Sequence, residues 1–185
     1  MPTSQMTQHQ PPARFARSRS SAARSTGCID SAGAFSAGRL RSGAMIGTVH
    51  EYALVIREHH LDTFGHVNNA RYLDIFEEAR WELITRNGFG LERVVRERLG
   101  PTILEVTLKF QRELRNRQPI TVKSWMLSYP RKVGQMVQEI RDADDGLCCE
   151  ARLAFGLFDL DARKLVAPTP AWLEAIGLTE DDLRA

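Results

Sequence analysis

The hydrophobic period of this 185-residue chain changes from helical to strand-like at Gly100-Pro101. Before that point, across residues 69–86, apolar residues recur every three or four positions, which is helical spacing. After it, across residues 104–110, they alternate at every second position, as in a half-buried strand. The helical stripe contains Leu73, Phe76, Ala79 or Arg80, and Leu83, and the first alternating face contains Leu104, Val106, Leu108 and Phe110. The pattern predicts one long helix followed by strands.

Further segments with strand-like alternation flank the helix, at residues 51–58, 120–126, 133–141 and 147–160. Asn87-Gly88 is a pair suited to end the long helix with a left-handed cap. Shorter helices are predicted at residues 91–99 and after Pro168-Thr169-Pro170. One long helix and an antiparallel sheet with tight turns form an α+β arrangement, in which the sheet wraps around the helix and buries its apolar stripe.

Residues 1–44 differ in composition from the rest. They contain six arginines, no lysine and one acid, Asp30, and have no sustained apolar period, so we expect a disordered tail. The tail therefore carries a formal charge of +5. Because the whole chain carries +2, the remaining residues carry −3. The folded part is thus mildly acidic and gives no basis for a nucleic-acid surface. The tail has the composition of an organellar transit peptide, or it results from a start codon assigned too early, with translation beginning at Met45. We favour the second interpretation, and residues 45–185 are then the single folded domain.

The sequence gives no indication of a membrane span or of an oxidising compartment. No apolar run approaches the roughly 18–20 residues that a transmembrane helix needs. Cys28 lies in the tail, and the neighbours Cys148 and Cys149 are expected to point to opposite faces of a strand, so no disulfide framework is predicted. We therefore expect a cytoplasmic protein.

The segment HLDTFGHVNNARY, residues 60–72, places more polar groups before the long helix than one cap requires. Asp62 lies between a strand and a helix start, where backbone amides are unpaired and the helix dipole is positive. Such a site can stabilise the oxyanion that forms at a thioester or ester carbonyl, while the carboxylate attacks directly or takes a proton from water. Alternatively, Asp62 and Asn68 only satisfy turn and cap amides, and the residues alone leave both interpretations open.

Motifs for other chemistries are missing. The chain has no GxSxG elbow, no Gly-rich phosphate loop, no HExxH and no CxxC pair. His59, His60 and His66 lie near Asp62, but neighbouring residues of a strand point in opposite directions and no further Cys or His completes a ligand set. We predict neither a metal ion nor another cofactor.

The segment DTFGHVNNARY, followed by LDIFEEAR, resembles the hotdog-fold thioesterases of the 4-hydroxybenzoyl-CoA thioesterase family, above all its bacterial long-chain acyl-CoA branch. The resemblance covers about residues 48–177. It implies a hotdog fold, with an antiparallel sheet wrapped around one long central helix. It also implies an enzyme that hydrolyses medium- to long-chain fatty acyl-CoA to free fatty acid and CoA. Homodimers with active sites at the subunit interface are implied as well, and pairing into tetramers is left open.

By the same resemblance, Asp62 is the catalytic carboxylate, as nucleophile or general base. The backbone amide of Asn69 polarises the thioester carbonyl, and Gly65 allows the substrate to approach closely.

Four further residues are candidates for substrate binding, and each has a structural alternative. His66 can brace the loop, Asn68 can cap the helix, and Tyr72 can pack at the interface. Glu77 is of interest because some hotdog thioesterases carry their carboxylate on this helix, although Asp62 makes a structural role the simpler interpretation.

Three rival functions remain. Acyl carrier protein thioesters would change the partner but not the chemistry. Hydration of an enoyl thioester would need Asp62 and His66 to act together, and the motif does not match. A non-catalytic module that binds acyl-CoA would be expected to lack the carboxylate. Fold alone does not decide among them.

Overall fold

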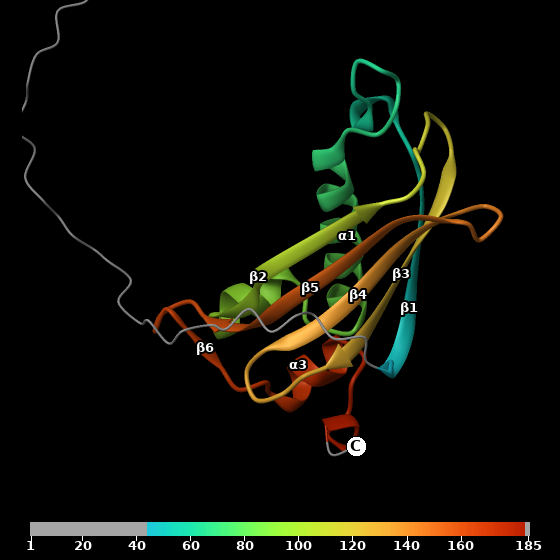
Figure 1. The fold of residues 1–185 in the computed structure, drawn as a ribbon. Coiled ribbons are helices and arrows are strands. Elements are labelled where there is room, and N and C mark those ends of the chain that lie inside the picture. Colours follow the sequence, from blue (N-terminus) through green and yellow to red (C-terminus); the bar gives the residue numbers. More distant parts are fainter. Residues whose placement is uncertain (1–43, 184–185) are drawn as a thin grey trace, which may run out of the picture. The chain divides into compact units, whose positions relative to one another are not determined.

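The computed structural model describes residues 44–183, which form one antiparallel sheet with helices (Figure 1). The strands are β1 (Ile46–Val55), β2 (Leu99–Phe110), β3 (Pro119–Ser128), β4 (Gly134–Asp142), β5 (Leu147–Asp159) and β6 (Lys164–Val166). The helices are α1 (Asn69–Arg86), α2 (Leu91–Glu97) and α3 (Pro170–Ala175), with short 3-10 helices η1 (Glu58–His60) and η2 (Asp181–Leu183).

The sheet has the strand order β1-β3-β4-β5-β2, and β6 pairs with β5. β1 and β2 are therefore the two edge strands of this path. Helix α1 packs against one face of the sheet, where its apolar residues join those of β3, β4 and β5 in one buried core (Figure 1). The predicted α+β class, with a sheet around one long helix, is confirmed.

The bounds of α1 agree with the prediction because both of its caps are local. The Asn68 side chain accepts a hydrogen bond from the amide of Ala70 at 2.9 Å, and the helix ends at Arg86, capped by Asn87 and followed by Gly88 with a φ of 80°. The predicted stripe was wrong at Leu73, which is 41% exposed. The sheet instead buries Tyr72, whose ring packs edge-on against Phe110 with centroids 5.0 Å apart.

The strands differ from the prediction mainly in β1 and β2. Strand β1 begins at Ile46 rather than at residue 51, and β2 begins at Leu99, before Pro101. An edge strand tolerates proline because its outer side lacks ladder hydrogen bonds. A bulge at Leu104 sets Ile103 opposite Phe155, so the predicted face was wrong at Leu104. The short strand β6 was not predicted.

The expected disordered tail, residues 1–44, lies outside the described residues except for its last position, and the domain boundary remains a prediction. Among the helices of residues 44–183, none is both long enough and apolar enough to cross a membrane.

Candidate active site

The loop between β1 and α1 folds back on itself around Asp62. The Asp62 amide donates to the His66 carbonyl oxygen at 2.8 Å. One carboxylate oxygen, Oδ1, accepts from the amides of Phe64 at 2.8 Å and His66 at 3.3 Å. Gly65 has a φ of 81°, which favours glycine, and this turn closes the loop. The other oxygen, Oδ2, accepts no hydrogen bond from the described residues, so it is available for chemistry.

The first turn of α1 supplies a free donor beside this carboxylate. The Asn68 side-chain oxygen accepts a hydrogen bond from the amide of Ala70, and the Asn68 carbonyl oxygen accepts one from the amide of Arg71 at 2.9 Å. The amide of Asn69 receives no acceptor from residues 44–183, as is common for the first position of a helix. Asp62 and Asn69 line the same pocket. The structure thus places a carboxylate with one free oxygen and an unpaired helix-start amide in one space.

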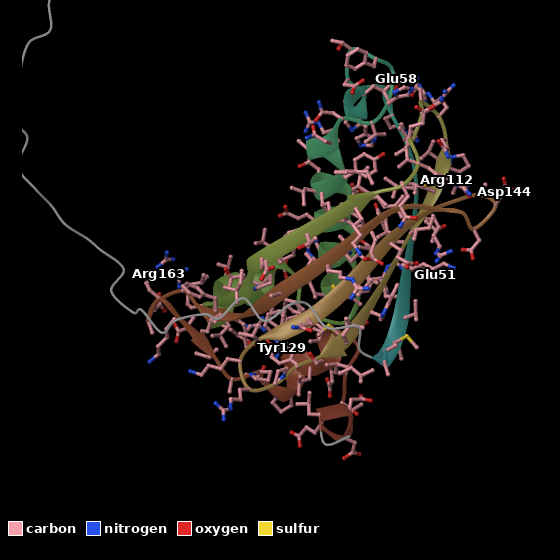
Figure 2. The ribbon with its side chains drawn as sticks, viewed as in Figure 1. Glu51, Glu58, Arg112, Tyr129, Asp144 and Arg163 are labelled. Carbon is pink, nitrogen blue, oxygen red and sulfur yellow. The ribbon has the colours of Figure 1, made fainter. Side chains whose placement is uncertain are left out.

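The opposite wall of the pocket comes from the end of β2 and the residues after it. It contains Phe110, Gln111, Arg112 and Glu113. The Val67 amide donates to the Leu114 carbonyl at 2.9 Å and holds the two segments together. Figure 2 shows Glu58 and Arg112 at this same end of the sheet, with Tyr129 and Arg163 at the other.

His66 has a partner in this wall that sequence reasoning did not find. Its Nε2 lies 3.0 Å from a carboxylate oxygen of Glu113, and both side chains are about half-exposed. The guanidinium of Arg115 also hydrogen-bonds Glu113 and keeps the pKa of that carboxyl below its ordinary value. No local motif could reveal Glu113, because the contact depends on the pairing of distant segments.

Tyr72 lines the pocket but is almost fully buried. Burial raises the pKa of its hydroxyl to about 12, so the group stays protonated at neutral pH. The Asn68 side-chain oxygen is held by the helix cap. Glu77 does not line the Asp62 pocket and instead lines a second cavity further along α1. Within the described part of the chain, no group of three His, Cys, Asp or Glu side chains could hold a metal ion.

A long helix on an antiparallel sheet, with a carboxylate and an unpaired amide at the helix start, is the arrangement of a hotdog-fold hydrolase. The family model described as "Thioesterase-like superfamily" matches residues 56–176, and the chain belongs to this family.

Known thioesterases are similar in sequence to this chain. The chain is 28% identical over 113 residues to the long-chain acyl-CoA thioesterase FadM of Escherichia coli, covering 60% of this chain and 85% of that protein. It is 34% identical over 85 residues to the chloroplastic acyl-acyl carrier protein thioesterase ATL3 of Arabidopsis thaliana, covering 46% of this chain and 45% of that protein.

Among solved structures, the hypothetical protein SAV2348 from Staphylococcus aureus, in complex with CoA, superposes with a TM-score of 0.67 at 18% identity, covering 77% of this chain and 90% of that one. The comparisons confirm the predicted family and hotdog fold, and at family level the prediction of a thioesterase.

Proposed function

We propose that this protein hydrolyses the thioester bond of medium- to long-chain fatty acyl-CoA and releases the free fatty acid and CoA. The observation that carries the proposal is the pocket shared by the free Oδ2 of Asp62 and the unpaired amide of Asn69. The 28% identity to a long-chain acyl-CoA thioesterase supports the substrate class.

The two groups have complementary roles. The Asn69 amide, at the positive end of the α1 dipole, donates to the thioester carbonyl oxygen and stabilises the charge that develops there. Asp62 acts in one of two ways. As a general base it takes a proton from water, whose oxygen adds to the carbonyl carbon. As a nucleophile it forms an acyl anhydride that water then hydrolyses. Either way the carbon–sulfur bond breaks and the CoA thiolate leaves, so no metal or redox cofactor is needed.

The remaining predicted site residues fit around this centre. A Cβ added at Gly65 would meet no heavy atom within 4 Å, which leaves open space beside the carboxylate for the thioester. His66, braced by Glu113, lies on the pocket wall and is available to contact the substrate. Asn68 keeps the first helical turn in place through its cap, and Tyr72, although almost fully buried, lines the pocket beside Phe110.

We further propose that the protein works as a homodimer, joined through β2, with the active sites at the interface. Strand β2 is a 12-residue edge with an unpaired outer side. Its large apolar residues are unusually exposed, at 39% for Ile103, 42% for Leu104, 36% for Val106 and 53% for Phe110. An exposed apolar edge of this length favours pairing with a second strand. Phe110 also lines the Asp62 pocket, so this contact would reach the site.

A reducing, cytoplasmic location fits the described cysteines. Cys148 and Cys149 are both free and buried, and burial raises the pKa of both thiols, to about 12 for Cys149. Unpaired thiols of this kind are usual where disulfides do not persist.

A second candidate substrate is an acyl carrier protein thioester, which the 34% identity to ATL3 favours. The chemistry would be the same, and the carrier would replace CoA.

The test is release of free thiol from acyl-CoA esters of C2 to C18 by wild type and by Asp62→Asn. We expect turnover by wild type that depends on chain length and falls at least roughly hundredfold in the variant, with the fold retained by circular dichroism. Turnover of carrier-protein thioesters alone would favour the second candidate. Binding without turnover of either would indicate a non-catalytic module. Equal activity in the variant would overturn the role of Asp62.

A further inference from the structure

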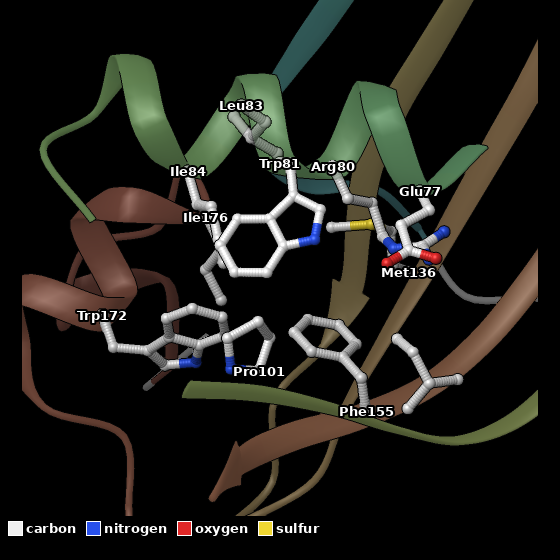
Figure 3. A pocket seen from close by; sticks show the side chains of 11 residues that line it. Glu77, Arg80, Trp81, Leu83, Ile84, Pro101, Met136, Phe155, Trp172 and Ile176 are labelled. Carbon is white, nitrogen blue, oxygen red and sulfur yellow. The ribbon is translucent and has the colours of Figure 1, made fainter. Parts of the chain in front are cut away.

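The Asp62 pocket contains a second carboxylate, Glu113, to which the proposed reaction gives no part. Glu113 lies shortly after the end of β2 and contacts His66, with 3.0 Å between its Oε2 and the imidazole Nε2. The carboxylate of Glu77, by contrast, lies beside the Arg80 side chain in a separate cavity (Figure 3). Of these two glutamates, Glu113 is therefore the one that can act on Asp62.

The main chain of His66 holds Asp62 from two sides. The His66 carbonyl oxygen accepts from the Asp62 amide at 2.8 Å, and the His66 amide donates to Asp62 Oδ1 at 3.3 Å. The Phe64 amide donates to the same oxygen at 2.8 Å. Because both bonds to the carboxylate end at Oδ1, the direction of the free Oδ2 depends on where the His66 peptide lies. A displacement of His66 would thus move the reacting oxygen.

The turn that contains these bonds has little packing to keep it in place. Phe64 is 83% exposed, and a Cβ added at Gly65 would meet no heavy atom within 4 Å. The bond from the His66 amide, at 3.3 Å, is longer than most amide hydrogen bonds. Segments with few buried apolar contacts open locally at low cost. The turn therefore depends on contacts that reach it from outside.

The residues that follow β2 supply those contacts. The Val67 amide donates to the Leu114 carbonyl at 2.9 Å, and His66 forms an isolated antiparallel bridge with Arg115. These backbone contacts do not fix the His66 ring, which can rotate about its own side-chain bonds. Among residues 44–183, the polar contact of this ring is with Glu113. Glu113 thus adds a side-chain anchor to the backbone ones.

Arg115 holds Glu113 in the position that this contact needs. The Arg115 guanidinium hydrogen-bonds Glu113 Oε1 through two of its nitrogens, with Nε at 2.9 Å, whereas His66 approaches the other oxygen, Oε2. The carboxylate therefore has one oxygen for each partner. Hydrogen bonding to Arg115 and the nearby charges of Arg115 and His66 keep the pKa of Glu113 below its ordinary value, so Glu113 is ionised at neutral pH.

We propose that Glu113 is a positioning residue, which holds the His66 ring and, through the His66 main chain, keeps the free oxygen of Asp62 directed into the pocket. The inference rests on the proposed thioesterase function and adds a residue to that same site. Since Glu113 acts on the geometry of the reacting carboxylate, its loss should lower kcat and leave KM nearly unchanged. Its loss should also change Tm little, because a half-exposed ion pair contributes little to global stability.

The first test is a double-mutant cycle of Glu113→Ala and His66→Ala, measured by thiol release. We expect Glu113→Ala alone to lower kcat at least roughly fivefold, because a small displacement of a reacting group is costly. When His66 is already alanine, the same substitution should change kcat less than about twofold. Glu113→Gln keeps an oxygen in place for the ring and should recover most of the wild-type kcat. Equal losses in both backgrounds would overturn the proposal, because Glu113 would then act without His66.

The matched control is Glu58→Ala. Glu58 connects the same two segments, through an ion pair with Arg117 at 2.6 Å and a hydrogen bond from the Asn116 side chain at 3.3 Å, but it does not line the Asp62 pocket. Its loss should leave kcat within about twofold of wild type. An equal fall in kcat for Glu58→Ala and Glu113→Ala would overturn the proposal, because any contact between the two segments would then have the same effect.

The second test, hydrogen–deuterium exchange of residues 61–67, does not depend on hydrolysis. Opening of the turn frees the amides of Phe64 and His66, which both donate to Asp62 Oδ1. We expect these amides to exchange several-fold faster in Glu113→Ala and at the wild-type rate in Glu58→Ala. Unchanged exchange in Glu113→Ala would contradict the proposal. Faster exchange in a protein that hydrolyses no acyl thioester would support the positioning role and overturn the proposed function.

Discussion

Gly65 and Gly88 form a matched pair for testing what the Asp62 loop needs. Their φ angles are 81° and 80°, and a Cβ added at either position would meet no heavy atom within 4 Å. Alanine at either position therefore has the same backbone cost, about 1 kcal/mol, which lowers Tm by roughly 3 °C. Only Gly65 lies beside the carboxylate.

We expect Gly65→Ala to lower kcat/KM for the best acyl-CoA ester by roughly tenfold or more, because a small displacement of a reacting carboxylate is costly. Gly88→Ala, at the far end of α1, should lose the same stability and stay within twofold of wild-type activity. Thermal denaturation and thiol release measure the two effects. Equal activities in the two variants would mean that Gly65 only closes the turn and has no further effect on catalysis.

The residues of the site differ in how well the sequence predicts them. Asp62 and Asn69 are seven positions apart, and the turn and the helix start that bring them together are both local signals. Glu113 was missed because its contact with His66 depends on the hydrogen bond between Val67 and Leu114, which pairs segments nearly fifty residues apart. A single sequence contains no local pattern for such a contact.

Among the elements, α1 depends on its cap both for stability and for the position of the Asn69 amide. Asn68→Ala removes the bond to the Ala70 amide and should cost about 1 kcal/mol. Fraying of the first turn should also lower kcat several-fold. Asn68→Ser restores a capping oxygen and should recover both properties. Urea denaturation and thiol release give the comparison. Loss of activity in the serine variant with full stability would mean that the Asn68 side chain contacts the substrate.

Gln138 ties α1 to the sheet at a buried position. Its side chain donates to the Phe76 carbonyl at 3.2 Å and to the Ser124 hydroxyl at 3.0 Å, and it accepts from Arg80 at 2.8 Å. Gln138→Leu leaves these groups without their partner and should destabilise the fold by about 2–4 kcal/mol in urea denaturation. Gln135→Leu, in the same strand but not in the buried core, is the control and should stay within about 0.5 kcal/mol. Similar losses in both variants would show that the network contributes little.

The elements also show where periodicity fails. The bounds of α1 could be predicted because caps act locally, but the face that it buries could not. Leu73 and Tyr72 are adjacent, and only the position of Phe110 in the folded sheet decides that Tyr72 is buried. Similarly, the bulge at Leu104 changes which residues of β2 share a face. The alternating sequence pattern of this segment does not reveal the bulge.

For the whole molecule, the two edge strands differ in the exposed apolar surface with which a second copy of the chain could pair. Strand β1 exposes Val49, and Met45 is exposed just before its start, whereas β2 exposes four large apolar residues between Ile103 and Phe110. Since Phe110 belongs both to this edge and to the Asp62 pocket, dimer formation through β2 and activity should be lost together.

We expect Leu104→Lys to raise the dimer dissociation constant at least roughly tenfold, since a lysine on an edge strand opposes pairing. A symmetric dimer carries the substitution in both protomers, so the two new lysines would repel each other. Val49→Lys places the same charge on β1, at a residue with a similar exposure of 44%, and should leave the dimer intact. Analytical ultracentrifugation gives the mass, and thiol release over a dilution series gives the activity per protomer. For Leu104→Lys, both should fall over the same concentration range. A dimer broken by Val49→Lys alone would place the interface at β1, and a fully active monomer would mean that one chain completes its own site.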